Sequence, residues 1–292
     1  MKPAPFTYHR ARDIDDATRL LSRLTDDGGD PRVLAGGQSL VAMMNYRLAR
    51  PGHLIDIGRL TTLRGLHTGE DGSLHIGALT THHAVETAPD AVLAPGFTVL
   101  RDAMRWVGHL PIRTRGTVGG SLAHADATAE WCLLAVLLDA VIVAQGPAGA
   151  RHIEADGFFH GHYTTALGPD ELLTEVVFPR PAPRAALTEF APRHGDFATV
   201  SAAVDLDVAG DGRTVRGGRV ALGGVAATPV RVPAAEAVLA RGGTAGPELA
   251  SAVARAAAEA VDPPADAAGD AEYRRGLART LVERAVRQAV AR

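Results

Sequence analysis

The stretch Arg32-Val33-Leu34-Ala35-Gly36-Gly37-Gln38-Ser39-Leu40 decides how the N-terminal part of the chain is expected to fold. A short apolar run leads into a glycine pair, and polar residues then precede a segment over residues 40–48 with helical character. This order predicts a strand, a tight turn and a helix. Glycines let backbone N–H groups approach an anion, and the start of a helix offers unpaired N–H donors. The stretch is therefore a candidate phosphate-binding loop, although a glycine pair also serves as an ordinary turn.

A second glycine pair lies in Thr117-Val118-Gly119-Gly120-Ser121-Leu122-Ala123-His124-Ala125-Asp126. Thr117 and Ser121 place hydroxyl groups on both sides of the glycines. His124 and Asp126 have groups suited to a sugar, a phosphate or a flavin edge, or to capping the next helix. A dinucleotide has two phosphates, so two loops of this kind would form one clamp. Neither loop has the G-x-G-x-x-G pattern of a Rossmann site or the lysine of a P-loop, so another nucleotide-binding fold is expected.

Apolar spacing on both sides of the first loop predicts a small β-loop-α-β unit. Residues 14–24 carry apolar side chains on one helical face, with Asp13 as the expected N-cap. Residues 53–57 form the expected closing strand, and the unit ends near Gly58.

The middle of the chain is expected to mix helices and strands. A hairpin is predicted around the turn Asp71-Gly72. Helices are predicted near residues 81–88, 97–107 and 130–139, and strands near 141–144 and 171–178. A domain boundary is expected at the proline-rich joint of Pro179, Pro181 and Pro183. Beyond it we expect strands at 198–208 and 214–222 and helices at 247–261 and 271–290.

Composition excludes several classes of protein. The formal net charge of −3 over 292 residues lacks the basic character of a nucleic-acid binder. Cys132 is the single cysteine, so the chain cannot form an internal disulfide or ligate an iron–sulfur cluster with cysteines. The N-terminus has no apolar signal core, and no apolar stretch is long enough to span a bilayer. A cytoplasmic protein without nucleic-acid or membrane partners is therefore expected.

Other motifs give weaker indications. His82-His83 and the pair His160 and His162 suggest metal ligands, but no third ligand follows at a recognisable spacing, so no metal site is predicted. Cys132 lies in an apolar helical run and is expected in the core. The serines of the two loops are not in G-x-S-x-G, which argues against a hydrolase. No catalytic residue is identified.

Taken together, these segments make the chain resemble the FAD-binding medium subunits of molybdenum hydroxylases. Carbon monoxide dehydrogenase medium subunits and the FAD domain of xanthine dehydrogenase belong to this family. The resemblance covers essentially the whole chain. Its marks are residues 34–40, Arg47-Leu48, Leu54-Ile55-Asp56-Ile57, Ile76-Gly77-Ala78-Leu79-Thr80, residues 116–126 and 193–198, Leu222-Gly223-Gly224-Val225 and Tyr273-Arg274.

The resemblance implies an α+β fold in three parts. Two N-terminal α/β subdomains, residues 1–58 and 59–178, would bind FAD between them, and residues 179–292 would form a C-terminal domain with a small antiparallel sheet and helices. The implied cofactor-binding residues come from both glycine loops and from scattered positions beside them. They are Leu34, Ala35, Gly36, Gly37, Gln38, Ser39, Leu40, Ala78, Thr80, Thr117, Gly119, Gly120, Ser121, His124, Asp126, Glu130, Leu172, Leu173 and Phe197.

Two positions depart from the family pattern. Asp126 is followed by Ala127, where the family often has proline. Some members have a lysine near Glu189 that can interact with the flavin, whereas the residue here is acidic. A cation would stabilise anionic reduced flavin, and Glu189 would oppose it if it faced the ring.

The resemblance also implies how the chain would work. Electrons would come from iron–sulfur clusters on a small partner subunit, after substrate oxidation at a molybdenum cofactor on a large partner subunit. FAD on this chain would pass them to NAD⁺, oxygen or a quinone. Two alternatives stay open at this point. One is a standalone flavoenzyme in which His109, His162 or Glu189 acts as a base, and the other is a non-catalytic nucleotide-binding or assembly protein.

Overall fold

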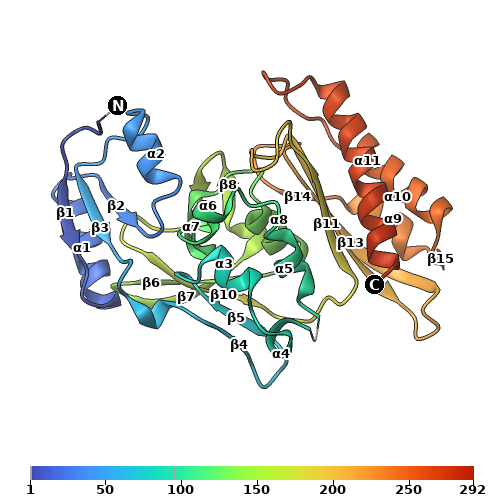
Figure 1. Ribbon diagram of the computed structural model, residues 1–292, viewed down its shortest axis with the longest axis horizontal. Coiled ribbons are helices and arrows are strands. Elements are labelled where there is room, and N and C mark those ends of the chain that lie inside the picture. The colour runs from blue at the N-terminus through green and yellow to red at the C-terminus, as the bar shows by residue number, and fades with distance from the viewer. Residues whose placement is uncertain (1, 95) are drawn as a thin grey trace.

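The computed structural model describes residues 2–94 and 96–292 and contains three main sheets, each built from one stretch of the chain. Figure 1 shows the N-terminal unit at one end, the middle unit beside it, and the C-terminal helices at the opposite end. The α+β fold class predicted from the sequence is confirmed. Within the described residues, no helix is both long and apolar enough to cross a membrane.

The first sheet contains three parallel strands in the order β1 (Thr7–Arg10), β3 (His53–Asp56) and β2 (Pro31–Leu34). Helix α1 (Ile14–Asp26) packs on it through Ala17, Leu21 and other residues of one face. Asp13 caps this helix as predicted, since its carboxylate accepts the N–H of Asp16 at 2.7 Å. Helix α2 (Leu40–Asn45) is shorter than expected, because the chain turns into the left-handed region at Arg47 (φ +57°).

The second sheet is antiparallel, and the N-terminal unit, which contains the first glycine loop, packs beside it. Its order is β4 (Leu66–Thr68), β5 (Leu74–Gly77), β10 (Leu172–Phe178), β6 (Val141–Gly146) and β7 (Gly149–Glu154). The hairpin predicted around Asp71-Gly72 is the β4–β5 connection. Short elements complete this unit: η1 (Thr61–Leu63), η2 (Ala155–Gly157), β8 (Phe159–Gly161) and β9 (Thr164–Thr165).

Helices of the middle unit cover one face of that sheet (Figure 1). They are α3 (His82–Glu86), α4 (Asp90–Leu93), α5 (Thr98–Ala103), α6 (Leu110–Arg113), α7 (Val118–His124) and α8 (Glu130–Leu137). The helices expected over 81–88 and 97–107 are thus shorter than predicted. Helix α8 is apolar on all sides and buried from Trp131 to Leu137, including Cys132. It can be apolar all round because it lies between two sheets.

The third sheet is antiparallel, with the order β11 (Ala185–Phe190), β12 (Val200–Val208), β13 (Thr214–Gly223) and β14 (Val230–Arg231), and β15 (Gly243–Thr244) pairs with β13. Helices α9 (Pro233–Ala240), α10 (Pro247–Glu259) and α11 (Ala271–Val290) cover its outer face (Figure 1). Leu187, Ala203 and Ala221 point the other way and belong to the same core as α8. The third sheet is therefore packed on both faces.

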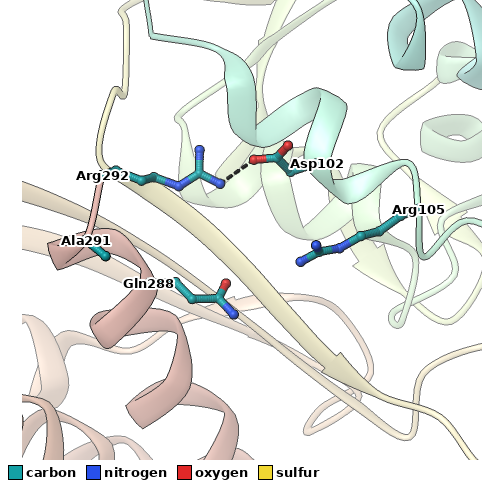
Figure 2. Close-up of a pocket in the computed structure, with 5 residues that line it drawn as sticks. All are labelled: Asp102, Arg105, Gln288, Ala291 and Arg292. Carbon is teal, nitrogen blue, oxygen red and sulfur yellow. Dashed lines mark hydrogen bonds and ion pairs between the residues drawn. The ribbon is translucent and has the colours of Figure 1, made fainter.

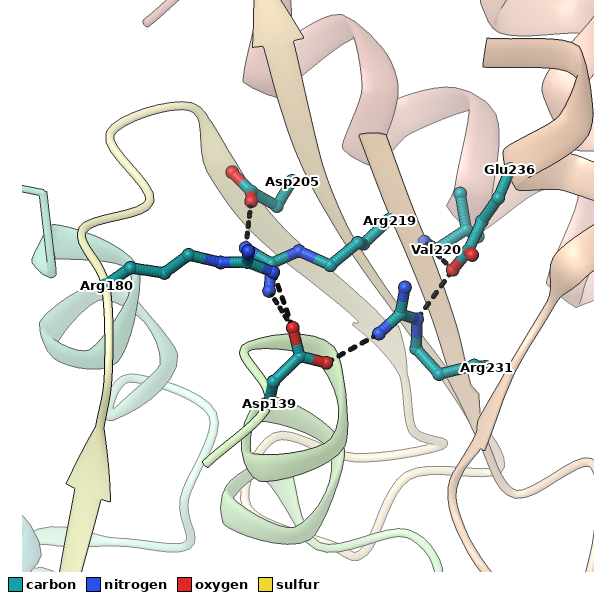
Figure 3. A network of polar contacts seen from close by, with 7 residues as sticks. All are labelled: Asp139, Arg180, Asp205, Arg219, Val220, Arg231 and Glu236. Carbon is teal, nitrogen blue, oxygen red and sulfur yellow. Dashed lines mark hydrogen bonds and ion pairs between the residues drawn. The ribbon is translucent and has the colours of Figure 1, made fainter. Parts of the chain in front are cut away.

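An ionic network joins the middle unit to the third sheet (Figure 3). Asp139, between α8 and β6, accepts hydrogen bonds from Arg180 (2.6 Å), Arg219 (2.6 Å) and Arg231 (2.8 Å). Two further carboxylates share these arginines, since Arg219 also binds Asp205 and Arg231 also binds Glu236, each at 2.6 Å. The two parts are thus joined by charge as well as by apolar packing.

Candidate functional site

A cavity of about 720 Å³ lies between the first unit and the middle unit. This volume is within the range of roughly 300–1,000 Å³ that is usual for small-molecule and cofactor sites. Both glycine loops line it, together with the start of β10, the segment from α7 to α8 and the loop 195–197. The two loops are far apart in the sequence, so the fold itself brings them together.

Gly36 is the point where the two loops touch. A Cβ atom at this position would lie 2.1 Å from the carbonyl oxygen of Arg115, which directly precedes the second loop. Gly37 follows in the left-handed region at φ +73°, which only glycine adopts readily. Both glycines are therefore required by the local backbone, one for close approach and the other for its conformation.

The first loop presents free backbone donors to the cavity. Among the described residues, no backbone or side-chain acceptor receives the N–H groups of Gly36, Gly37, Gln38 or Ser39. These residues line the cavity and lead directly into α2. Consecutive unpaired N–H groups in a turn that precedes a helix form an anion-binding concavity. The arrangement of these amides in the cavity fits the phosphate-binding interpretation of the loop.

The second loop offers different chemistry, because its own amides are already paired. Val118 N–H donates to Thr80 O at 3.0 Å, Gly119 N–H to Ala78 O at 2.9 Å, and Gly120 N–H to Thr117 Oγ1 at 3.1 Å. Gly119 packs closely on Ala78, the residue that follows β5, since a Cβ on Gly119 would lie 2.6 Å from the Cβ of Ala78. The loop thus gives close approach and the hydroxyl groups of Thr117 and Ser121 rather than a row of free amides.

A polar and aromatic cluster lies where α7 ends. Asp126 accepts from the backbone N–H and the hydroxyl of Thr128 at 2.9 and 2.8 Å. The ring of His124 packs against Tyr163 at 4.9 Å between centroids, and the Tyr163 hydroxyl donates to Asp126 at 3.4 Å. Burial lowers the pKa of His124, and the charge of Asp126 raises the pKa of Tyr163.

Sequence reasoning missed Tyr163, which also lines the cavity. It is held at φ +54°, a strained conformation for an aromatic residue. Its N–H donates to Ala125 O at 3.3 Å, and Ala125 is itself at φ +54°. The only local signal was an aromatic residue following His160-Gly161-His162.

The apolar part of the cavity comes from several elements. Leu172 and Leu173 begin β10, and Leu40 begins α2. Phe197 also lines the cavity and is 66% exposed, so much of its ring is available to a ligand or a partner. Glu130, the first residue of α8, also lines the cavity.

The structure brings together all of the residues implied by the resemblance except Leu34 and Thr80. Thr80 is buried, and its hydroxyl donates to Gly65 O at 2.9 Å and accepts Gly65 N–H at 3.0 Å. Leu34 ends β2, and its carbonyl binds the N–H of Ile57 at 3.1 Å. Both residues support the cavity from behind, and neither reaches it.

Three of the histidines considered as metal ligands have other partners, and one of these, His83, pairs with Glu86 at 3.1 Å. His82 is buried and accepts the indole N–H of Trp131 at 3.0 Å, and burial lowers its pKa to about 4. His160 bonds the carbonyl of Gly157 at 3.1 Å. In the described part of the chain, one group has the spacing of metal ligands: His67, His75 and Glu175, on three neighbouring strands of the second sheet.

Comparison with known proteins gives matches over the whole length. Residues 4–181 match the family described as FAD binding domain in molybdopterin dehydrogenase, and residues 185–289 match the CO dehydrogenase flavoprotein C-terminal domain. The chain is 39% identical to the nicotine 6-hydroxylase medium subunit of Paenarthrobacter nicotinovorans, covering 100% of both chains. It is 36% identical to the carbon monoxide dehydrogenase medium chain of Hydrogenophaga pseudoflava, covering 100% of this chain and 99% of the relative.

A solved structure of carbon monoxide dehydrogenase from Hydrogenophaga pseudoflava superposes with a TM-score of 0.92 at 36% identity, covering 100% of this chain and 99% of that one. The fold, the cavity and these matches define an FAD-binding oxidoreductase subunit. More narrowly, the chain belongs to the family of FAD-binding medium subunits of molybdenum hydroxylase-type dehydrogenases. The resemblance seen in the sequence is therefore confirmed.

The residues of the cavity fit FAD as this family's cofactor. The first loop supplies unpaired N–H donors for a pyrophosphate, and a side chain at Gly36 or Gly119 would not fit in its place. The second loop supplies hydroxyl groups, and His124, Asp126 and Tyr163 supply polar and aromatic contacts. Residues of both the first unit and the middle unit line the cavity, so both units can contact a bound dinucleotide.

Proposed function

We propose that the chain is the electron-outlet subunit of a cytoplasmic, three-subunit molybdenum hydroxylase. A small partner subunit carries the iron–sulfur clusters, and a large one carries the molybdenum cofactor and selects the substrate. Bound FAD supplies the redox chemistry, because it accepts electrons from the clusters and passes them to an external acceptor. The single cysteine, Cys132, is buried in the core, which supports placing the clusters on a partner.

We also propose how the residues of this chain hold the cofactor. The free amides of residues 36–39 bind one phosphate, and the hydroxyls of Thr117 and Ser121 bind near the other. Leu172, Leu173 and Phe197 pack against the flavin, and His124, Asp126 and Glu130 contact its polar edge or the adjoining sugar. In this proposal Ala35, Gln38, Leu40 and Ala78 complete the wall. Residues 1–58, 59–178 and 179–292 act as the three domains.

The row of unpaired amides in the first loop carries this proposal, and the decisive experiment follows from it. The chain alone should bind one FAD per molecule, with a change in the flavin absorption spectrum. Purification of a tagged chain from its host should also recover molybdenum and iron in a stable complex. A yellow chain that is reduced by a small substrate without any partner would contradict the subunit role. A chain that takes up no FAD would contradict the cofactor site itself.

A further inference from the structure

Three residues form a row across the inner face of the third sheet. Glu189 on β11 is the register partner of Ser201 on β12, and Ser201 is the register partner of Gly223 on β13. Register partners in an antiparallel sheet point to the same face, and their side chains are neighbours. This is the face that packs on α8, because Leu187, two residues before Glu189, belongs to the core around that helix.

The polar atoms in this row lack protein partners. Glu189 is only 8% exposed, and its Oε2 is fully buried with no hydrogen bond from any described residue. The Oγ of Ser201, which is fully buried, is also without a partner there. Gly223 makes room for the serine, since a Cβ at Gly223 would lie 2.5 Å from Ser201 Oγ. Fully satisfied buried groups are the rule in proteins, so two orphan oxygens side by side call for a physical reason.

Glu130 approaches the same place from the cavity side. It begins α8, and the segment just before it lies against the row, because Ala127 O accepts the N–H of Gly224 at 3.2 Å. Glu130 lines the FAD cavity. The segment that leads into Glu130 therefore contacts the strand end beside the row, and Glu130 lines the cavity whereas Glu189 does not.

The charges around the pair disfavour two carboxylates. Burial, reinforced by the charge of Glu130, raises the pKa of Glu189 to about 9. Burial, reinforced by Asp126, raises the pKa of Glu130 to about 7. Arg105 acts on Glu189 in the opposite direction, but it is exposed and its guanidinium points into a hollow beside Gln288 and Arg292, as Figure 2 shows, so solvent screens it.

Another cation close to the row, Arg274, has both terminal nitrogens already paired. Arg274 comes from α11, and its guanidinium binds the carbonyls of Thr199 (2.6 Å) and Gly224 (2.8 Å) as well as Asp266 (2.6 Å). A buried carboxylate without a cation or hydrogen-bond donors is costly, and such a group takes up a proton instead. A proton on Glu189 removes the charge from this buried carboxyl, so the oxygen without a partner is neutral rather than anionic.

We propose that Glu130 and Glu189 act together as a proton store in the wall of the FAD cavity, so that the pair binds a proton when negative charge accumulates in the cavity. This inference uses the proposed FAD site, and it concerns protons only. Two-electron reduction of FAD bound in the cavity would add negative charge there, and one proton from solvent, besides those that the flavin itself takes up, would then bind a carboxylate oxygen of the pair. An O–H bond forms on the carboxyl group, and no other bond of the protein changes. The two carboxyls titrate as one unit, with two successive proton losses that belong to the pair.

The first test uses the protein without FAD, so it does not depend on the proposed function. Infrared spectra are recorded as the pH is raised from about 4 to about 10, a range that brackets the ordinary and the raised carboxyl values. The stretching band of a protonated carboxyl should persist above neutral pH in the unmodified chain. In the unmodified chain this band should disappear in two steps as the pH rises. In E130Q and in E189Q it should disappear in a single step. E248Q, the same change at an exposed residue of α10, should behave like the unmodified chain.

The second test connects the pair to the cavity. Proton uptake is measured with a pH indicator when the FAD-loaded chain is reduced by two electrons near neutral pH. The unmodified chain and E248Q should each bind more protons per FAD than the double variant E130Q/E189Q, with a difference of at most one proton. The midpoint potential of the flavin should therefore fall more steeply with pH in the unmodified chain than in the double variant. One proton per two electrons corresponds to a difference of up to about 30 mV per pH unit.

Each outcome decides a separate question. Loss of the carboxyl band at ordinary acidic pH in the unmodified chain would overturn the proposal. This measurement uses the unmodified chain alone, so it does not depend on whether any variant folds. Persistence of the band with equal proton uptake in all variants would overturn the link to the cavity. Failure of the chain to bind FAD would overturn the proposed function and leave the first test intact.

Discussion

The backbone of Gly36 lies against the carbonyl group of Arg115 so closely that a Cβ on Gly36 would be 2.1 Å from the carbonyl oxygen. Gly36 belongs to the first glycine loop, in the first unit, and Arg115 lies two residues before Thr117, which begins the second loop, in the middle unit. The contact fixes the spacing between a row of free amides and a pair of hydroxyl-bearing residues. It is therefore the point on which the geometry of the cofactor site depends most.

The variant Gly36→Ala should weaken FAD binding. The added methyl group has no room, and the atoms that it meets are backbone, so the loops must move apart. The displacement should raise the dissociation constant for FAD by about tenfold or more, which corresponds to about 1.4 kcal/mol. Titration of the apo-protein with FAD, followed by flavin fluorescence, measures this constant. Gly210→Ala is the matched control, because a Cβ there meets nothing within 4 Å.

Local pattern was enough to predict the glycine loops, the Asp13 cap and most helices and strands, because each depends on neighbouring residues in the chain. The close contact of Gly36 with Arg115 could not be predicted in this way, since it joins segments distant in sequence. Strands β1, β7 and β11 and helices α7 and α9 were not predicted. For β1 and β7 the reason is that their exposed, polar residues carry no alternating apolar pattern. Tyr163 was missed because its place depends on the left-handed backbone at Ala125.

The variant Asp139→Asn should loosen the joint between the middle unit and the third sheet. Asn keeps the shape and tolerates the backbone at φ +52°, so the change isolates the charge shared by Arg180, Arg219 and Arg231 (Figure 3). Its loss should lower the free energy of unfolding by about 1–2 kcal/mol. Urea denaturation measures this difference, which should shrink as salt is added.

A control for this variant comes from an isolated surface pair. Asp207 binds Arg216 at 2.7 Å, and both side chains are largely exposed. Asp207→Asn should therefore change the free energy of unfolding by less than about 0.5 kcal/mol. Equal effects of the two substitutions would show that the Asp139 network adds nothing beyond an ordinary surface ion pair.

His82 should limit stability in acid. Its pKa is lowered by burial to about 4, below the ordinary value of 6.5, so the unfolded chain binds the proton more readily than the folded chain. The stability that depends on neutral His82 is fully present above about pH 6.5 and is lost progressively as the pH falls toward 4. The loss from one proton is at most about 1.4 kcal/mol per pH unit. Urea denaturation at a series of pH values should show a shallower acid fall in His82→Gln, but not in His160→Gln at an exposed site.

Glu189 should produce the opposite dependence in base. Its pKa is raised from 4.5 to about 9, so between these values the folded chain holds a proton that the unfolded chain has released. The contribution of this proton to stability is fully present below about pH 4.5 and is lost as the pH rises through 9. The free energy of unfolding of the apo-protein should therefore fall with rising pH by up to about 1.4 kcal/mol per unit.

The variant Glu189→Gln tests this dependence directly, because glutamine keeps the size of the side chain and cannot lose the proton. Its free energy of unfolding should change less between about pH 6 and pH 9 than that of the unmodified chain, and Glu248→Gln should keep the full slope. A difference confined to this pH window identifies the buried carboxyl at Glu189, whereas a packing defect would lower stability equally at every pH. The same slope in all three proteins would mean that Glu189 is ionised in the folded chain, and that a buried carboxylate lies there with one oxygen that receives no hydrogen bond from any described residue.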